Sequence, residues 1–315
     1  MNGDCGYFGP DSMSWRVLTA PAVPLMVAQI TNLLEVPHVD FQSVLLDHDP
    51  LYPTNAKRQR GWPRGAGRKG GHFHDRLRRT VSVPLPIVLG DKAAANRCAT
   101  RLRKYHEPMR GVGEDGHTPY SATSADAMLF AAVTITHAAL IAYESFVPRK
   151  GILPQRLSPE DRDRYFSEMS HMASLMGADP GAVPTSAQAV ADYYDSISAS
   201  FRFRSGWFSA QIRTATSLMW PANRHDVGAT LADLILMASA VLALAVLPRP
   251  SRRLNGIPAV CDPGLRLLHL ACVPGWALLR LEPVRRWAHR SFLGADDAEV
   301  VQRAAMEVDR VRVAA

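Results

Sequence analysis

Residues 126–146, DAMLFAAVTITHAALIAYESF, are apolar on nearly every side of the helix that they would form. A helix that is apolar all round either lies buried in the centre of a protein or crosses a membrane. The length of this stretch and the charged Glu144 near its end argue against a membrane span. We therefore predict a central buried helix around which the rest of the chain packs. His137 lies inside it, and we interpret this residue as a core histidine rather than a pocket donor.

Helical patterns continue on both sides of this stretch. Residues 15–35 are apolar but interrupted by Pro21 and Pro24, which predicts a kink or a break. Residues 40–47 form a short helix, flanked by His38 and His48, which we interpret as surface or capping histidines. Ser158 caps a helix that runs to residue 176 and ends at a glycine. Further helices are expected over residues 186–204, 207–219, 226–247 and 263–292, the last interrupted at its prolines.

No repeat and no strand-like alternation is found, so the predicted fold is all-α, a single-domain helical bundle. Residues 226–247 are the most hydrophobic segment, and we interpret them as a buried core helix rather than a membrane span. Residues 294–315 have the pattern of an exposed amphipathic tail.

Residues 72–111 read HFHDRLRRTVSVPLPIVLGDKAAANRCATRLRKYHEPMRG. An arginine-bearing helix is expected up to residue 89. A second helix follows from about residue 93 to 105, with its apolar face at Ala94, Cys98, Leu102 and Tyr105. His106 ends this helix. A histidine at a helix end facing an apolar pocket can ligate a metal or a haem iron. The alternative interpretation is that His106 caps the helix or lies in the core, since histidine has many roles other than metal binding.

Two arginines and a threonine stand out in the first of these helices. Arg76 and Thr80 are four residues apart and therefore point the same way, while Arg79 is on the neighbouring face. The pattern alone fits a solvated basic surface as well as an anion-binding face.

The charge balance narrows the classes of partner. The net charge is +7 and the isoelectric point about 9.5. A positive net charge favours binding to nucleic acid, to an anionic membrane surface or to an acidic ligand. No zinc-finger, RNA-binding or P-loop pattern is present, so nucleic acid is not an expected partner. The arginines after residue 247 allow a peripheral membrane contact. The basic loop 49–71 is either a flexible connection or a lid over a pocket.

The four cysteines are sparse, and none forms a CxxC pair. They are typical of reduced cysteines in a cytosolic protein. The first residues lack the basic and apolar regions of a signal peptide, so a cytoplasmic protein is expected.

Several motifs occur together in a specific order. They are the opening GYFGPDS at residues 6–12, the sequence RLRRT at residues 76–80 and, after one helix, HEPMRG at residues 106–111. In this order they resemble the DUF2236 family, which includes the rubber oxygenase (latex clearing protein) and the oxygenase of mycophenolic acid assembly. The similarity runs nearly to residue 292. It implies a haem-oxygenase domain over residues 1–293, with a globin-like core, and a helical tail over 294–315.

The resemblance also implies a chemistry. Haem b would be held by His106 as the proximal iron ligand, with Arg76, Arg79 and Thr80 on the distal side or at the propionates. The reaction would use O2 and a hydrophobic small molecule such as a terpenoid, polyketide or lipid. Neither the identity of the substrate nor the choice between C=C cleavage and hydroxylation follows from the sequence, and oligomeric state is equally open.

The sequence departs from the family pattern at three places. Arg79 stands where the rubber oxygenase has a lysine, and arginine cannot be deprotonated at ordinary pH, although it can hold a propionate or carboxylate. Phe130-Ala131-Ala132 replaces a Trp-Val-His cluster, which implies a wider cavity and a different substrate. Met109 replaces a valine.

These departures leave other functions open beside a haem b-dependent oxygenase. One is a haem or hydrophobic-ligand binding protein without turnover, and another is a protein that keeps only the fold. A non-haem iron site from His72, His74 and Asp75 has the right ligand types, but two histidines two residues apart point to different sides of a helix. The general base is unassigned among four acidic residues: Glu35, Asp40, Asp47 and Glu107.

Overall fold

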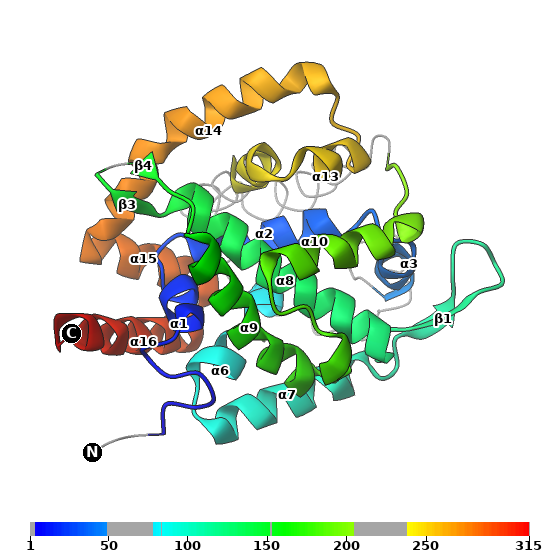
Figure 1. Cartoon of the computed structure of the whole chain (residues 1–315), viewed down its shortest axis with the longest axis horizontal. Helices are drawn as coiled ribbons and strands as arrows, with labels where there is room; N and C mark the ends of the chain where they lie inside the picture. The colour runs from blue at the N-terminus through cyan, green and yellow to red at the C-terminus, as the bar shows by residue number, and fades with distance from the viewer. Residues whose placement is uncertain (1–3, 49–77, 83, 152, 205–237, 315) are drawn as a thin grey trace, which may run out of the picture.

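Helix α8, Ala125–Phe146, forms the centre of the protein, as the apolar stretch predicts (Figure 1). The helix begins at Ser124, whose hydroxyl accepts a hydrogen bond from the Ala127 amide at 3.2 Å. The computed structural model describes residues 4–48, 78–82, 84–151, 153–204 and 238–314. The predictions for residues 49–77, 207–219 and 226–237 lie outside these ranges.

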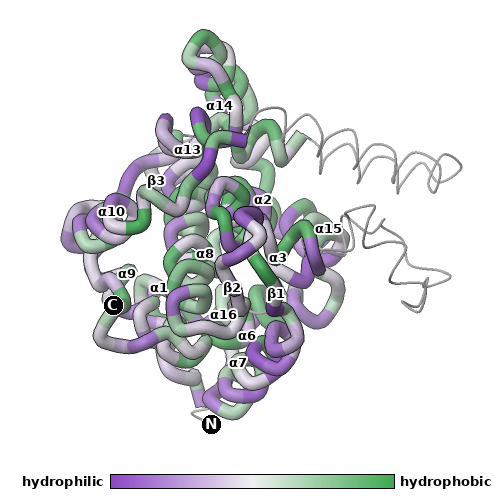
Figure 2. Tube along the Cα trace, turned by 90° about the vertical axis from the view of Figure 1, so that its right-hand side faces the viewer, coloured by the Kyte–Doolittle hydropathy of each residue, from purple (hydrophilic) through white to green (hydrophobic). Residues whose placement is uncertain are grey.

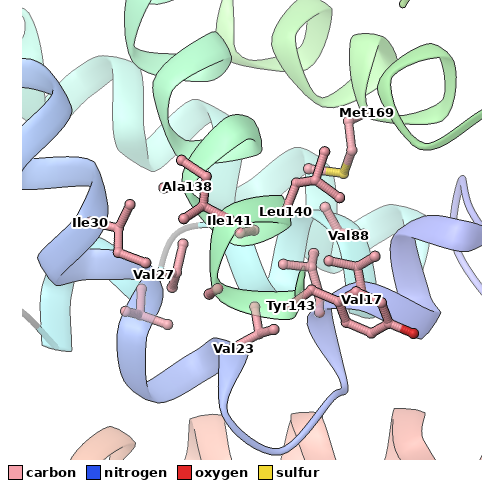
Figure 3. Packing of buried hydrophobic residues seen from close by; sticks show 14 of the residues in the cluster. Val17, Val23, Val27, Ile30, Val88, Ala138, Leu140, Ile141, Tyr143 and Met169 are labelled. Atoms are coloured by element: carbon pink, nitrogen blue, oxygen red, sulfur yellow. The ribbon is translucent and has the colours of Figure 1, made fainter. Parts of the chain in front are cut away.

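Helix α2, Val23–Glu35, packs along α8. It is separated from α1, Met13–Leu18, by a turn at the predicted proline break. Figure 3 shows Val27 and Ile30 of α2 facing Ala138 and Ile141 of α8, while Leu140 meets residues of other helices on the opposite side. Burying one such aliphatic side chain contributes about 1.5–3 kcal/mol relative to leaving it exposed, so this seam is the main source of core stability.

Helix α9, Pro159–Met176, crosses in front of α8 (Figure 1). Ser158 caps it, and Gly177 ends it with a φ of 115°, a left-handed conformation that glycine adopts at least cost. The Tyr165 hydroxyl donates to the Thr136 carbonyl of α8 at 3.0 Å. The predicted start and end of this helix are both confirmed.

Helices α6, Pro84–Leu89, and α7, Lys92–His106, pack against each other as a hairpin turning at Gly90. A side chain at Gly6 would clash with the Gly90 carbonyl oxygen, so the opening segment lies directly on this turn. The indole nitrogen of Trp15 donates to the Val88 carbonyl at 2.7 Å. The N-terminal segment therefore fixes the position of the α6–α7 hairpin.

The C-terminal quarter differs from prediction at two points. Helix α14, Asp262–Ala277, continues through Pro274, where a break was expected. The other expected break, at Pro283, is confirmed, because α15, Glu282–Leu293, begins one residue before it. Helix α16, Ala295–Ala314, packs on α1, α6 and α15, so the expectation of an exposed tail is wrong for its apolar face. That face is buried through Ala298, Val301, Ala304 and Val308.

Smaller elements complete the fold. Helix α10 ends before the predicted residue 204, because Phe201 leaves the helix to form a bridge with His38. Two antiparallel hairpins were not expected from the sequence. The remaining elements are α3 Val39–His48, α10 Ala187–Ser196, α13 Arg249–Leu254, the hairpin of β1 Arg110–Val112 with β2 Pro119–Ser121, and the hairpin of β3 Pro148–Lys150 with β4 Leu153–Pro154.

By length and composition alone, α8 is apolar enough to cross a membrane, as is the pair Ala259–Arg280 and Glu282–Leu293, which bends by 103°. Within the protein, most of α8 is covered by neighbouring helices. The hydropathy colouring of Figure 2 shows α14 at the periphery of the molecule, with apolar residues along it. The described part of the chain thus forms one all-α domain, which confirms the predicted fold class.

Candidate functional site

His106 is the last residue of α7 and lies on the buried side of that helix. The helix begins at Asp91, whose carboxylate accepts a hydrogen bond from the Ala94 amide at 2.6 Å. Its buried residues are Ala95, Ala99 and Leu102, and His106 continues this line at the next helical spacing. The predicted apolar face was displaced by one position, because Tyr105 is 47% exposed.

The imidazole of His106 has its two nitrogens in different surroundings. Nδ1 lies 2.9 Å from the Leu102 carbonyl oxygen. A carbonyl only accepts hydrogen bonds, so Nδ1 carries the hydrogen and Nε2 has the lone pair. No hydrogen bond to Nε2 is found among the described residues. Burial lowers the pKa of His106, although the backbone hydrogen bond acts in the opposite direction, so the neutral form is favoured. A neutral imidazole with a free Nε2 and a fixed Nδ1 suits a metal.

Arg79 and Thr80 lie on the helical residues 78–81, just before α6. Arg79 is exposed and Thr80 is partly buried, whereas Arg76 lies outside the described residues. Over the described ranges, no hydrogen bond, ion pair or ring contact joins either residue to His106. Of the predicted distal residues, the two that the structure describes, Arg79 and Thr80, are therefore not in direct contact with His106.

Residues 78–82 and the middle of α7 both lie near the start of α16. The Ser82 hydroxyl bonds the Asp297 carboxylate of α16. The pKa of Cys98, in the middle of α7, is raised by burial and also by Asp297.

A small polar cluster follows His106 on the β1–β2 hairpin. The Met109 carbonyl accepts the Ala122 amide at 2.9 Å, which closes the base of the hairpin. The Tyr120 hydroxyl donates to Asp47 of α3 at 2.6 Å, and burial and this carboxylate raise the pKa of Tyr120. His48 lies edge-on to Tyr120 and has a buried Nε2 with no partner. His48 is thus packed against the hairpin.

A second buried polar cluster joins α2, α8 and α10. Thr134 is fully buried, and its hydroxyl donates to the Glu35 carboxylate at 2.7 Å. One turn further along α8, His137 Nδ1 lies 3.4 Å from the Tyr194 hydroxyl. Glu35 also acts on Tyr194, because burial and the charge of this carboxylate raise the pKa of that hydroxyl. This cluster therefore places one carboxylate, that of Glu35, beside two neutral groups that can exchange a proton, the His137 imidazole and the Tyr194 hydroxyl.

Burial, together with the nearby Arg162, lowers the pKa of His137 to about 4. The histidine is therefore neutral at physiological pH and can accept a proton only from a stronger acid. From the sequence we predicted Glu35 as one of four candidate bases and His137 as a core residue. Thr134 and Tyr194 were not predicted. Thr134 could have been identified from the sequence, because it is a polar residue inside an otherwise apolar helix.

The expected widening of a cavity at Phe130-Ala131-Ala132 is not seen in the described residues. Phe130 is 5% exposed and lies against His38, with ring centroids 4.3 Å apart, and against Phe201 at 6.1 Å. Burial lowers the pKa of His38. This aromatic group fills the space beside the small residues.

In the part of the chain that the structure describes, no three His, Cys, Asp or Glu residues are grouped to hold a metal ion. The alternative iron site at His72, His74 and Asp75 lies outside the described residues. A haem needs one protein nitrogen rather than a cluster. His106 offers one, and so does His289, whose Nε2 lies 2.8 Å from the Pro21 carbonyl oxygen and whose buried Nδ1 has no partner among the described residues.

The family model described as ER-bound oxygenase mpaB/B'/Rubber oxygenase, catalytic domain, matches residues 15–299. The match covers the central helix, the α6–α7 hairpin with His106, and the beginning of α16. No curated protein and no solved structure matched the chain. Since the match spans most of its length, the chain belongs to the family of the mpaB/B' and rubber oxygenase catalytic domain.

Proposed function

We propose that the protein is a haem b-dependent oxygenase that acts with O2 on a hydrophobic small molecule. Family membership supports an oxygenase, and the observation that carries the haem proposal is the geometry of His106. Its Nδ1 is held by the Leu102 carbonyl, and its Nε2 has no hydrogen-bond partner among the described residues.

His106 would hold the iron from the proximal side. The Leu102 carbonyl orients the ring and makes the imidazole a better donor, as hydrogen-bonded metal ligands generally are. When bound, haem supplies the activation of O2. The lowered pKa of His106 keeps its ring neutral and able to coordinate down to mildly acidic pH.

Arg76, Arg79 and Thr80 are proposed to hold the propionates or to line the distal side. An arginine can bind a propionate through two parallel hydrogen bonds, and it stays charged throughout. The supporting observation is that Ser82 and Cys98 of α7 both lie near Asp297 of α16. The buried Glu35–Thr134 and His137–Tyr194 pairs are the described groups able to hold a proton in the core.

A second candidate function is a haem or hydrophobic-ligand binding protein without turnover. Arg79 favours it, because arginine replaces the family lysine and is exposed in the structure. O2-dependent conversion of a hydrophobic compound by the purified protein would exclude this candidate.

The first experiment is an absorption spectrum of the purified protein, as isolated and after dithionite, beside His106→Ala. A Soret band that is lost or shifted in the variant is expected. His117→Ala is the matched control, because His117 is exposed on the hairpin and its imidazole has no described partner. Imidazole added to His106→Gly should restore the band, which a purely structural role for His106 would not allow. Absence of a Soret band after haem is supplied during expression would overturn the proposal.

We also propose a cytoplasmic location with a peripheral contact to an anionic membrane. The supporting observation is a strip of exposed apolar residues on α14, on the segment after it and on α15. Leu267 is 70% exposed, Leu281 55% and Trp287 57%, and exposed arginines such as Arg266 and Arg280 lie among them. Such a combination suits the surface of a bilayer with anionic lipids.

A further inference from the structure

A cavity of about 340 Å³ lies at the end of α8 opposite to His106. Its wall is formed by α1, the end of α8, α15 and the last turns of α16. The lining residues are Arg16, Thr19, Ala20, Pro21, Tyr143, Val147, Pro148, Gln155, Arg285, Ala305, Val308, Asp309 and Arg312. Since α8 has 22 residues, its two ends are roughly 33 Å apart, so this cavity is separate from the proposed haem site.

Three arginines from three helices converge on the cavity. Arg16 comes from α1, Arg285 from α15 and Arg312 from α16. Asp309 is the one acidic residue in the lining, and it forms no ion pair with any of these arginines. The lining therefore carries three positive charges and one negative charge.

The guanidinium group of Arg16 is not satisfied by the protein. Its Nε is buried and has no hydrogen-bond partner in the described part of the chain. Its remaining contact is a weak one, from Nη1 to the Met13 sulfur at 3.9 Å. Arg285 is partly buried, and among the described residues its side chain has no hydrogen bond or ion pair. Leaving a buried donor without a partner is unfavourable, because the group has lost its water without gaining another hydrogen bond, which is a reason to expect a ligand.

Several arginines elsewhere in the C-terminal helices are paired. Arg252 and Arg253 both contact Asp262, Arg286 contacts Glu282, and Arg310 contacts Glu307 on α16 at 2.6 Å. The arginines there without a described partner, Arg266, Arg290 and Arg303, are exposed to solvent, whereas the unpartnered Nε of Arg16 is buried.

We propose that this cavity binds a small dianion, a phosphate monoester or a dicarboxylate, through Arg16, Arg285 and Arg312. The net charge of the lining, three positive and one negative, matches a doubly charged ligand. Guanidinium groups bind phosphate and carboxylate oxygens through paired hydrogen bonds. Thr19, Tyr143 and Gln155 add neutral polar groups, and Figure 3 shows the Tyr143 hydroxyl at the edge of the hydrophobic cluster.

The apolar part of the lining limits the rest of the ligand. Ala20, Pro21, Val147, Ala305 and Val308 form small hydrophobic surfaces between the charged groups. A volume of this size is at the lower end of ordinary small-molecule sites. The ligand is therefore a compact metabolite with a short carbon skeleton and not an extended hydrophobic chain.

The test is isothermal titration calorimetry of the full-length protein with inorganic phosphate and, separately, with succinate, at constant ionic strength set by sodium chloride. Saturable binding of either dianion is expected, and the stronger of the two identifies the class of anion. Arg16→Gln and Arg285→Gln should each weaken it at least tenfold. Arg303→Gln is the matched control, because Arg303 is exposed on α16 outside the cavity, and its affinity should equal that of the wild type.

Asp309→Asn gives an effect of the opposite sign. Removing the one carboxylate of the lining should strengthen dianion binding several-fold, and this result does not depend on whether an arginine variant folds. Circular dichroism of each variant shows whether the helical content is kept. The proposal is overturned if neither dianion binds saturably, or if Arg16→Gln and Asp309→Asn both leave the affinity unchanged. None of these measurements requires haem, so failure of the oxygenase proposal would not affect them.

Discussion

Helices α8 and α14 are both strongly apolar, but α8 lies in the core and α14 lies at the surface. Along α8, residues from Met128 to Phe146 are mostly buried, whereas Val273 is the only buried residue of α14 in the described protein. Apolar composition alone therefore did not decide burial in this chain. The decisive difference is that α2, α9 and α1 pack directly on α8, while three leucines of α14 remain 38–70% exposed.

The largest expected effect comes from the centre of α8. Leu140 is fully buried between Val88 and Met169 (Figure 3). Leu140→Ala should lower the free energy of unfolding by about 2–5 kcal/mol through lost burial and a residual cavity. Leu267→Ala on α14 is the matched control and should change it by less than about 0.5 kcal/mol. Urea unfolding followed by circular dichroism measures both, and equal losses would show that α14 is also part of the core.

The next effect concerns the histidine inside α8. Its pKa falls from an ordinary 6.5 to about 4 in the folded protein. Above pH 6.5 the folded and unfolded chains are both neutral at this site. Between pH 6.5 and 4 only the unfolded chain binds the proton, so stability falls as the pH falls, by about 3 kcal/mol in total. Below about pH 4 the loss is complete.

Urea unfolding at a series of pH values measures this slope, and His137→Gln should flatten it. The pKa values of His38, His106 and His289 are lowered as well, by burial, so part of the slope will remain in the variant. An unaltered slope in His137→Gln would show that His137 is not kept neutral by the fold.

A smaller effect is expected from the buried hydrogen bond of Thr134. Thr134→Val keeps the shape of the side chain but leaves the Glu35 carboxylate without this donor, which should cost about 1–3 kcal/mol. Thr100→Val, at an exposed position of α7, is the control for the change of residue type. If the two variants are equally stable, the Glu35–Thr134 bond does not support the core.

Local patterns predicted most of the helices. The start of α9 was recognisable from Ser158 and its end from Gly177, because a cap and a left-handed glycine are local features. The break expected at Pro274 did not occur, since a proline on an exposed helix removes one hydrogen bond without blocking the helix. The β1–β2 hairpin was missed because strands of three residues are too short to show an alternating pattern.

The candidate sites were less predictable than the helices. His106 was found because it ends a helix within a specific motif, but its orientation depends on Leu102 and could not be read from spacing. The Glu35–Thr134 pair joins residues 99 positions apart, and Arg16, Arg285 and Arg312 meet only because α16 folds back onto α1. Contacts between distant segments depend on tertiary packing, which no local pattern encodes.

The smallest effect on stability is expected from α14. The double substitution Leu267→Ser, Leu270→Ser changes two side chains that are 70% and 49% exposed, so the free energy of unfolding should change by less than about 0.5 kcal/mol. Sedimentation with vesicles containing anionic lipid should nevertheless fall, because apolar contact with the membrane is lost. Val313→Ser on α16, 88% exposed, is the control for both measurements.

The two readouts together decide what the apolar surface of α14 is for. Unchanged stability with reduced vesicle binding would mean that this helix is exposed in solution and serves as a contact surface. A stability loss of 2 kcal/mol or more would mean that the leucines are covered by protein, and the membrane proposal would then fail. In that case α14 and α8 would owe their apolar sequences to the same cause, the burial of side chains against other helices.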